Sequence, residues 1–148
     1  MILIAHRGNI NGKIPERENH PDYIKEALDQ GYDVEIDVWR IGDQLFLGHD
    51  GPEYKVDESF IKNESFWHHA KNIEAIQYLN NVKPNYLINC FYHQTDDCVL
   101  TSGGWIWTYP GKPILSNAAV AVLPERIGES YDIGKAGAIC SDVIINFK

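Results

Sequence analysis

The chain has 148 residues, of which 44% are hydrophobic and 23% are charged. This composition fits a single globular domain over residues 1–148 and excludes a disordered chain. The net charge of −8 is spread along the sequence without a long basic run, so a nucleic-acid-binding surface is not expected. A small anionic substrate can still bind if a metal ion or a few Arg and Lys side chains act locally.

The longest apolar runs, such as residues 118–123, are far shorter than the ~20 residues that a membrane span needs. The apolar residues 1–5 follow no basic segment of the kind that opens a signal peptide. Cys90, Cys98 and Cys140 are an odd number without CxxC spacing, which is typical of buried reduced thiols rather than of disulfides or a zinc site. We therefore expect a soluble, cytoplasmic protein without a membrane span.

The first predicted elements alternate between strand and helix. Residues 2–5 form a short apolar run, which predicts a buried strand that ends at a loop. A helix should follow, with Asn19 as its cap and Gly31 at its end. Residues 33–39 alternate between apolar and polar side chains with a period of two, which predicts a strand. After a turn, residues 45–50 form a further extended segment.

The remainder of the chain is predicted to hold one more helix and five short strands. The helix covers residues 72–82 and ends at Pro84, because proline cannot continue it. The links between the later strands contain Gly and Pro and are too short or too broken for full helices. The five strands are expected over residues 66–71, 86–92, 105–109, 119–123 and 138–143.

The strand, helix, strand order at the start indicates parallel pairing through a right-handed crossover, and hence an α/β fold. A full eightfold barrel usually needs ~250 residues. We therefore expect a reduced TIM-barrel-like (β/α) barrel in which several outer helices are shortened or missing. In such a fold, the polar residues at the carboxyl ends of the strands meet at one rim, and Ser141 and Asp142 would close that rim.

Polar residues follow several of these strands. Glu35 and Asp37 stand two apart on one strand, so their carboxylates point to the same face and repel each other unless a cation is present. Oxygen ligands of this kind suit Mg²⁺ or Ca²⁺. The alternative is that both lie on the solvated face of an edge strand. His6 and His49 end two other segments, and two histidines beside a metal ion could act in turn as base and acid.

Four motifs occur in order: AHRG at residues 5–8, EN at 18–19, GYDVEIDVW at 31–39 and LFLGHD at 45–50. In this order and spacing they make the chain resemble the glycerophosphodiester phosphodiesterase family, and more broadly the phosphatidylinositol-phospholipase-C-like phosphodiesterases. The segment AGAICSD at residues 136–142 resembles the last barrel strand of that family. The chain is therefore similar to a short member of the family.

The resemblance implies a barrel that hydrolyses phosphodiesters with a divalent ion. It places the general base and general acid roles on His6 and His49. It also implies that Glu35 and Asp37 bind the metal and that Arg7 contacts the phosphate, which the planar guanidinium can hold through two oxygens at once.

The third metal ligand is where the sequence departs from the family. The family has an E-x-K pattern on the next strand, and this chain has His69 and Lys71 at the corresponding positions. His69 could bind a softer ion such as Mn²⁺, leave its place to water, or pass the role to Glu18. Lys71 is a candidate phosphate contact, or else part of the first turn of the next helix. Trp107 could line a wall for the alcohol part of the substrate, or simply pack in the core.

The sequence thus predicts a metal-dependent phosphodiesterase that acts on a small phosphodiester by histidine acid and base catalysis. One alternative is a cyclising phosphodiester lyase of the sphingomyelinase-D-like kind. The other is a binding module that has kept the pocket without turnover. Missing outer helices would expose apolar strand faces, which favours a homo-oligomer.

Overall fold

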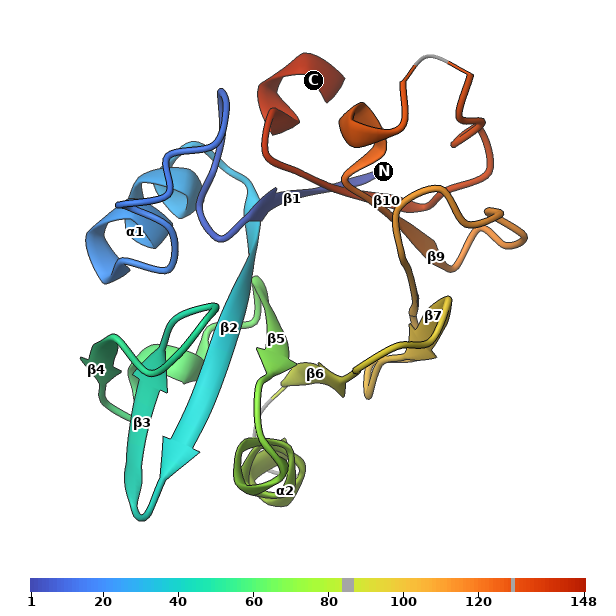
Figure 1. Ribbon diagram of the computed structural model, residues 1–148. Coiled ribbons are helices and arrows are strands. Elements are labelled where there is room, and N and C mark those ends of the chain that lie inside the picture. Colours follow the sequence, from blue (N-terminus) through green and yellow to red (C-terminus); the bar gives the residue numbers. More distant parts are fainter. Residues whose placement is uncertain (84–86, 129) are drawn as a thin grey trace.

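A computed structural model describes residues 1–83, 87–128 and 130–148. Its centre is one curled, mixed β-sheet, shown in Figure 1. The strands are β1 (Ile2–His6), β2 (Asp33–Ile41), β3 (Gln44–Leu47), β4 (Tyr54–Val56), β5 (Phe66–Ala70), β6 (Asn89–Tyr92), β7 (Cys98–Leu100), β8 (Ile106–Thr108), β9 (Ala119–Val122) and β10 (Ala138–Ser141). The helices are α1 (Pro21–Asp29) and α2 (Ile73–Val82), with the short 3₁₀ turns η1 (Phe60–Lys62), η3 (Pro124–Arg126) and η4 (Ile144–Phe147).

The central strands of the sheet run parallel. Strand β1 lies between β2 and β10. The parallel order continues through β5 and β6 on one side and through β9 and β8 on the other. Strands β3, β4 and β7 are antiparallel additions. In Figure 1 most strands follow one another around a ring, with β3 and β4 outside it beside β2. No ladder joins β6 to β7 in the described ranges, so the sheet is a half-barrel.

The prediction of a reduced TIM-barrel-like (β/α) barrel is wrong. Such a barrel alternates parallel strands with helices, whereas the described part of the chain has only two α-helices, of 9 and 10 residues, and a sheet that mixes parallel and antiparallel pairs. The physical reason lies in the connections. Strands β8 and β9 are joined by residues 109–118 without a helix, and the described residues between β9 and β10 form only the short turn η3.

Most predicted elements occur with shifted ends. Helix α1 begins after His20, not after the predicted cap Asn19, because the His20 side chain accepts the hydrogen bond from the backbone N–H of Asp22. The predicted helix stop at Pro84 and the first residue of the predicted strand 86–92 lie outside the described residues. Strands β4 and β7 were not predicted, since three residues are too few to show a period.

Two hydrophobic clusters lie on opposite faces of the curled sheet. The inner cluster joins side chains from strands all around the ring, including Trp67, Phe91 and Trp107. The outer cluster includes Val34 on β2 and Leu79 on α2, and it packs the two helices against the sheet. Because side chains alternate along each strand, the residues next to Val34 point into the ring.

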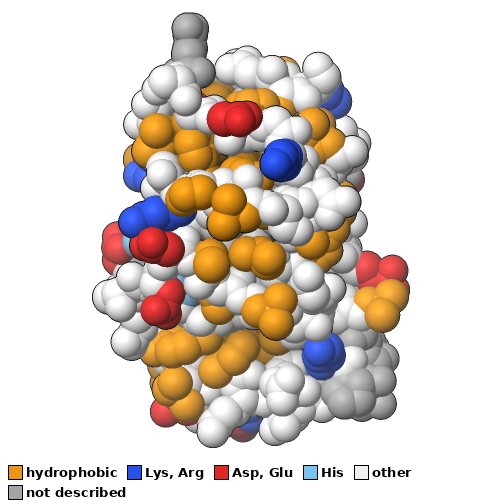
Figure 2. Space-filling model, turned by 90° about the vertical axis from the view of Figure 1, so that its right-hand side faces the viewer, with side chains coloured by type: hydrophobic (Ala, Val, Ile, Leu, Met, Phe, Trp, Pro, Cys, Tyr) orange, Lys and Arg blue, Asp and Glu red, His pale blue; other side chains and the backbone are white. Residues whose placement is uncertain are grey.

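The side of the molecule that carries β7 exposes hydrophobic side chains. Figure 2 shows them gathered on this face, and Leu100 and Leu115 are 69% and 85% exposed. Leu115 also lines an apolar pocket of about 260 Å³. Self-association through such a surface stays a prediction. In the described ranges, no helix combines the length and the apolar character needed to cross a membrane.

Candidate active site

Glu35, Asp37 and His69 bring three metal-binding groups together inside the curled sheet. The alternation of β2 directs both carboxylates inward, and the parallel register of β5 sets His69 beside Asp37. One ligand atom from each of the three residues lies within 4.8 Å of the other two. We call these residues the triad. Backbone pairing between the adjacent strands β2 and β5 brings the three residues of the triad together.

The two carboxylates of the triad are buried. Glu35 is 1% exposed and Asp37 is 0% exposed, and β2 lies between β1 and β5. This excludes the alternative that the pair lies on the solvated face of an edge strand. Glu35 Oε2 and Asp37 Oδ1 are buried, and neither has a hydrogen-bond partner in the described ranges. Burying a charged oxygen without a hydrogen bond is costly. The nearby His69 and Lys71 offset part of that cost at Asp37 Oδ1, and a bound cation would offset more of it at both oxygens.

Positive groups lie close to Asp37. Arg7 Nε lies 3.0 Å from Asp37 Oδ2, His69 Nδ1 lies 3.2 Å from Oδ1, and Lys71 Nζ lies 3.6 Å from Oδ1. Burial alone would raise the pKa of Asp37, but the contact with His69 and the charges of Arg7 and Lys71 lower it well below its usual range. Asp37 therefore stays ionised and available as a ligand.

The imidazole of His69 responds to the same charges. Burial lowers the pKa of His69, but its contacts with Asp37 and Glu35 raise it above its ordinary value. A proton on His69 offsets part of the carboxylate charge. A divalent ion bound to His69 Nδ1 and to both carboxylates would offset more of the carboxylate charge. The donor set of two carboxylates and one imidazole suits Mn²⁺ as well as Mg²⁺ or Ca²⁺.

Glu18 holds Arg7 in place. Arg7 donates to Glu18 Oε2 at 3.0 Å, and the Asn9 side-chain amide donates to Glu18 Oε1 at 3.0 Å. Both carboxylate oxygens are therefore engaged, and Glu18 is not among the clustered ligand atoms. This arrangement favours a role in orienting the guanidinium over the predicted role as a metal ligand.

His6 points one ring nitrogen toward the triad. Its Nδ1 lies 2.7 Å from Asp142 Oδ1, and its Nε2 lies 3.8 Å from Glu35 Oε2. Burial would raise the pKa of Asp142, but the contact with His6 and the hydrogen bonds from Arg126 and Asn9 lower it. An ionised carboxylate only accepts hydrogen bonds, so Nδ1 carries the hydrogen. The Nε2 atom is then the ring nitrogen that faces the triad and is placed to exchange a proton.

His49, in contrast, lies apart from the triad. It follows β3 in an exposed loop, and its Nδ1 lies 2.7 Å from Asp50 Oδ1. Its side chain is 41% exposed, and no hydrogen bond or ion pair joins it to the triad within the described ranges. His49 and Arg7 line the same polar pocket of about 390 Å³, whose lining also includes Glu18 and Asn19 but no residue of the triad.

Trp107 is linked to the triad through Phe91. It is 3% exposed and stacks on Phe91 with ring centroids 4.6 Å apart, while Phe91 stacks on His69 at 4.8 Å. This aromatic stack supports the imidazole of His69, which is the packing alternative rather than a substrate wall. Lys71 lies between the end of β5 and the Asn72 cap of α2, so it belongs to the rim and not to the helix.

Several residues of the site carried little or no signal in the sequence. Asn19 was predicted as a helix cap and as part of the EN motif, without its contact to Asp37, and Asp142 as a residue that closes the rim. Asn9 and Arg126 were not predicted at all. Polar residues in loops are common for local reasons, so their sequence context could not have separated Asn9 or Arg126 from ordinary loop residues.

No protein-family model, curated protein or solved structure matches the chain. The similarity to glycerophosphodiester phosphodiesterases therefore stays a prediction from the four motifs, and a function is inferred from these motifs and from the geometry of the site.

Proposed function

We propose that the chain is a metal-dependent phosphodiesterase that acts on a small phosphodiester of the glycerophosphodiester type. The observation that carries this proposal is the buried triad, in which oxygens of Glu35 and Asp37 lack hydrogen-bond partners in the described ranges. A divalent ion held by the triad would bind a phosphate oxygen and offset the negative charge of the transition state.

Basic side chains near the triad support an anionic substrate. Arg7 and Lys71 lie beside Asp37, and Lys13 and Arg126 line the same polar pocket as Arg7. The same pocket is also lined by Glu18, Asp50 and Glu53, so the attraction of a phosphate would come from Arg7 and Lys71 together with a metal ion in the triad. The guanidinium of Arg7 can hold two phosphate oxygens, since Glu18 fixes its orientation.

The His6–Asp142 pair supports acid and base chemistry. Asp142 orients the imidazole, and Nε2 is directed toward the triad, where it can exchange a proton with an oxygen of the substrate. If water attacks the phosphorus, the products are a phosphomonoester and an alcohol. If a neighbouring hydroxyl of the substrate attacks, the product is a cyclic phosphate, as in the sphingomyelinase-D-like alternative.

The proposal includes a cytoplasmic location and a small-molecule partner. Three free cysteines, two of them buried, support a reducing compartment. The size of the polar pocket, about 390 Å³, fits a small ligand.

The test is hydrolysis of an aryl phosphodiester with Mg²⁺, Mn²⁺ and Ca²⁺ in parallel. We expect metal-dependent turnover that falls by about 100-fold or more in Asp37→Asn and in His6→Ala. Product analysis in ¹⁸O-labelled water, with a diester that carries a neighbouring hydroxyl, separates the two routes: labelled monoester indicates hydrolysis, and unlabelled cyclic phosphate indicates the lyase. Equal residual rates in the wild type and both variants would exclude catalysis by this site and would favour the alternative of a phosphodiester-binding module without turnover.

A further inference from the structure

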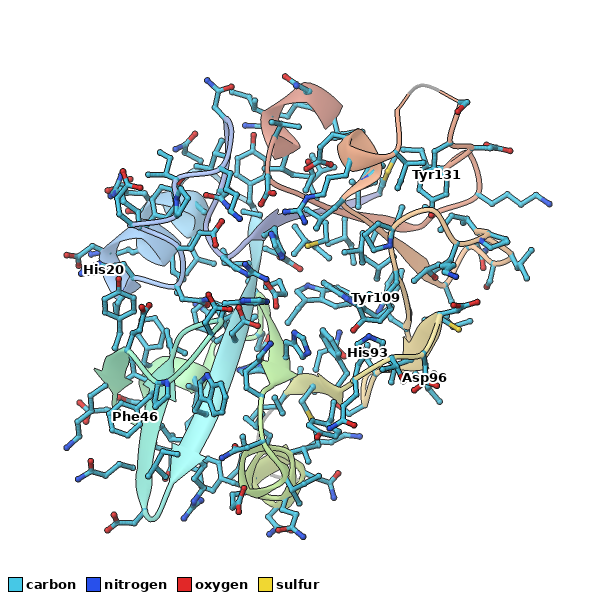
Figure 3. All side chains as sticks on the ribbon, in the orientation of Figure 1. His20, Phe46, His93, Asp96, Tyr109 and Tyr131 are labelled. Carbon is cyan, nitrogen blue, oxygen red and sulfur yellow. The ribbon has the colours of Figure 1, made fainter. Side chains whose placement is uncertain are left out.

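His93 and Tyr109 form a second pair of polar side chains at the same end of the sheet as the triad. His93 directly follows β6, and Tyr109 directly follows β8. Their rings are stacked with centroids 3.5 Å apart and an angle of 22° between the planes. Figure 3 shows the two labelled side chains next to each other within the ring of strands.

Each of the two side chains has a buried polar atom without a hydrogen-bond partner in the described residues. These atoms are the Nδ1 of His93 and the hydroxyl oxygen of Tyr109. Buried polar atoms are usually satisfied, so an unsatisfied pair needs an explanation. A ligand oxygen that enters the site would supply the missing partner.

Electrostatic effects connect this pair to the triad. Burial raises the pKa of the Tyr109 hydroxyl, and the charges of Glu35 and Asp37 raise it further. Burial lowers the pKa of His93, and the charge of His69 lowers it further, while Asp96 acts in the opposite direction. Tyr109 is therefore a protonated donor near neutral pH, and His93 is a neutral imidazole that can accept a proton.

The order of the strands places a histidine on each side of the triad. Strands β2 and β5 carry the triad, β1 pairs with β2, and β6 pairs with β5. His6 ends β1, and His93 follows β6. A phosphate bound at the triad would thus have His6 on one side and His93 on the other, while His49 lies in the exposed loop beyond β3.

We propose that His93, rather than His49, is the second proton-transfer residue of this site; the inference rests on the proposed phosphodiesterase function. His93 takes the proton of the attacking water or hydroxyl as the new oxygen–phosphorus bond forms. His6, in the form with a proton on each ring nitrogen, gives the Nε2 proton to the oxygen of the leaving alcohol as the old bond breaks, and Nδ1 keeps its hydrogen bond to Asp142. The two imidazoles then return to their starting states by proton exchange with solvent. Tyr109 positions His93 through the ring stack.

The experiment compares His93→Ala, His93→Gln and His49→Ala with the wild type on one aryl and one alkyl phosphodiester at saturating Mn²⁺. We expect kcat/KM to fall by about 100-fold or more in both His93 variants. Added imidazole should restore part of the activity of His93→Ala, since it supplies the missing base, and a merely structural role would not respond to it. His20→Asn serves as the control, because His20 caps α1 away from the triad and Asn keeps the cap.

His6→Ala provides an internal comparison. A donor to the leaving oxygen matters more for an alkoxide than for a weakly basic aryloxide, so His6→Ala should lose more activity on the alkyl ester. His93→Ala should lose activity on both esters to a similar extent, because a base acts on the nucleophile.

A calorimetric titration with Mn²⁺ separates the two proposals. Metal affinity should be retained in the His93 variants and lost in Glu35→Gln. Three results with an active wild type would overturn the role of His93 alone. These are a near-normal kcat/KM in the His93 variants, a larger loss of kcat/KM in His49→Ala than in the His93 variants, and no rescue of His93→Ala by imidazole. A wild type that binds Mn²⁺ but cleaves neither ester would overturn the proposed function and this inference together.

Discussion

Asn19 binds both the backbone and the side chain of Asp37. Its Nδ2 donates to Asp37 Oδ2, and its Oδ1 accepts from the backbone N–H of Asp37, each at 2.9 Å. Asn19 is fully buried and has a φ of 62°, in the left-handed region that Asn adopts more readily than most residues. The loop before α1 therefore fixes the orientation of a carboxylate on β2.

Replacing Asn19 by Gly should weaken both the fold and the metal site. Gly keeps the left-handed backbone, so the variant removes only the two hydrogen bonds, and we expect the free energy of unfolding to fall by about 1–3 kcal/mol. Asn19→Ala should lose about 1 kcal/mol more, because it adds the cost of a positive φ. Urea unfolding of the three proteins measures both differences. A Gly variant as stable as the wild type would contradict the role given to this amide.

The two carboxylates of the triad could be predicted because their geometry is local, whereas His69 joins them through the pairing of β5 with β2. Glu35 and Asp37 are two residues apart on a strand, so they share a face whatever the rest of the fold does. The contacts of His6 could not be predicted in the same way. Its partner Asp142 lies 136 residues away in the sequence, and no spacing rule relates two residues at that separation. The order of the strands, which decides this contact, is a property of the whole sheet.

The fold class was harder to predict from the sequence than the positions of the individual strands. Apolar runs located β1, β9 and β10 to within a few residues, and the alternation of apolar and polar residues located β2. The parallel pairing of β1 with β2 follows from the helix between them. The prediction of a reduced (β/α) barrel allowed for missing helices in the later links, but it did not include the antiparallel pairs that β3, β4 and β7 add to the sheet. Strands β8 and β9 pair in parallel although residues 109–118 between them form no helix. The β-propensity of the strand residues does not indicate which strands pair or in which direction.

Glu18→Gln distinguishes a positioning role from a metal-binding role. The neutral amide cannot pair with Arg7 as a carboxylate does, so we expect KM for the phosphodiester to rise by about tenfold while the Mn²⁺ affinity stays close to that of the wild type. Glu35→Gln is the matched change inside the triad and should lose metal binding. Steady-state kinetics and a Mn²⁺ titration provide the two measurements. A parallel loss of metal affinity in both variants would make Glu18 a ligand.

His69→Glu tests how the third ligand selects the ion. Three carboxylates favour a hard cation more strongly than two carboxylates and an imidazole. We therefore expect the stabilisation by Mg²⁺ or Ca²⁺ to increase relative to that by Mn²⁺, and stability without metal to fall because the cationic contact with Asp37 is lost. Thermal unfolding with each ion measures the order, and His69→Gln serves as a neutral control. An unchanged order of ions in all three proteins would remove His69 from the metal site.

Asp142→Asn should change how stability depends on pH. The pKa of Asp142 is lowered in the folded chain by His6, Arg126 and Asn9 despite its burial. Its contribution is therefore fully present above the unfolded Asp pKa of about 3.9 and is lost as the pH falls from there toward the lower native value. We expect the Asn variant to lose about 1–3 kcal/mol at pH 7 and to show a shallower decline below pH ~4. Urea unfolding between pH 2 and 7 measures both, with Asp43→Asn in an exposed turn as the control. Curves for the wild type and Asp142→Asn that run parallel through the acid range would show that Asp142 gains nothing from these partners.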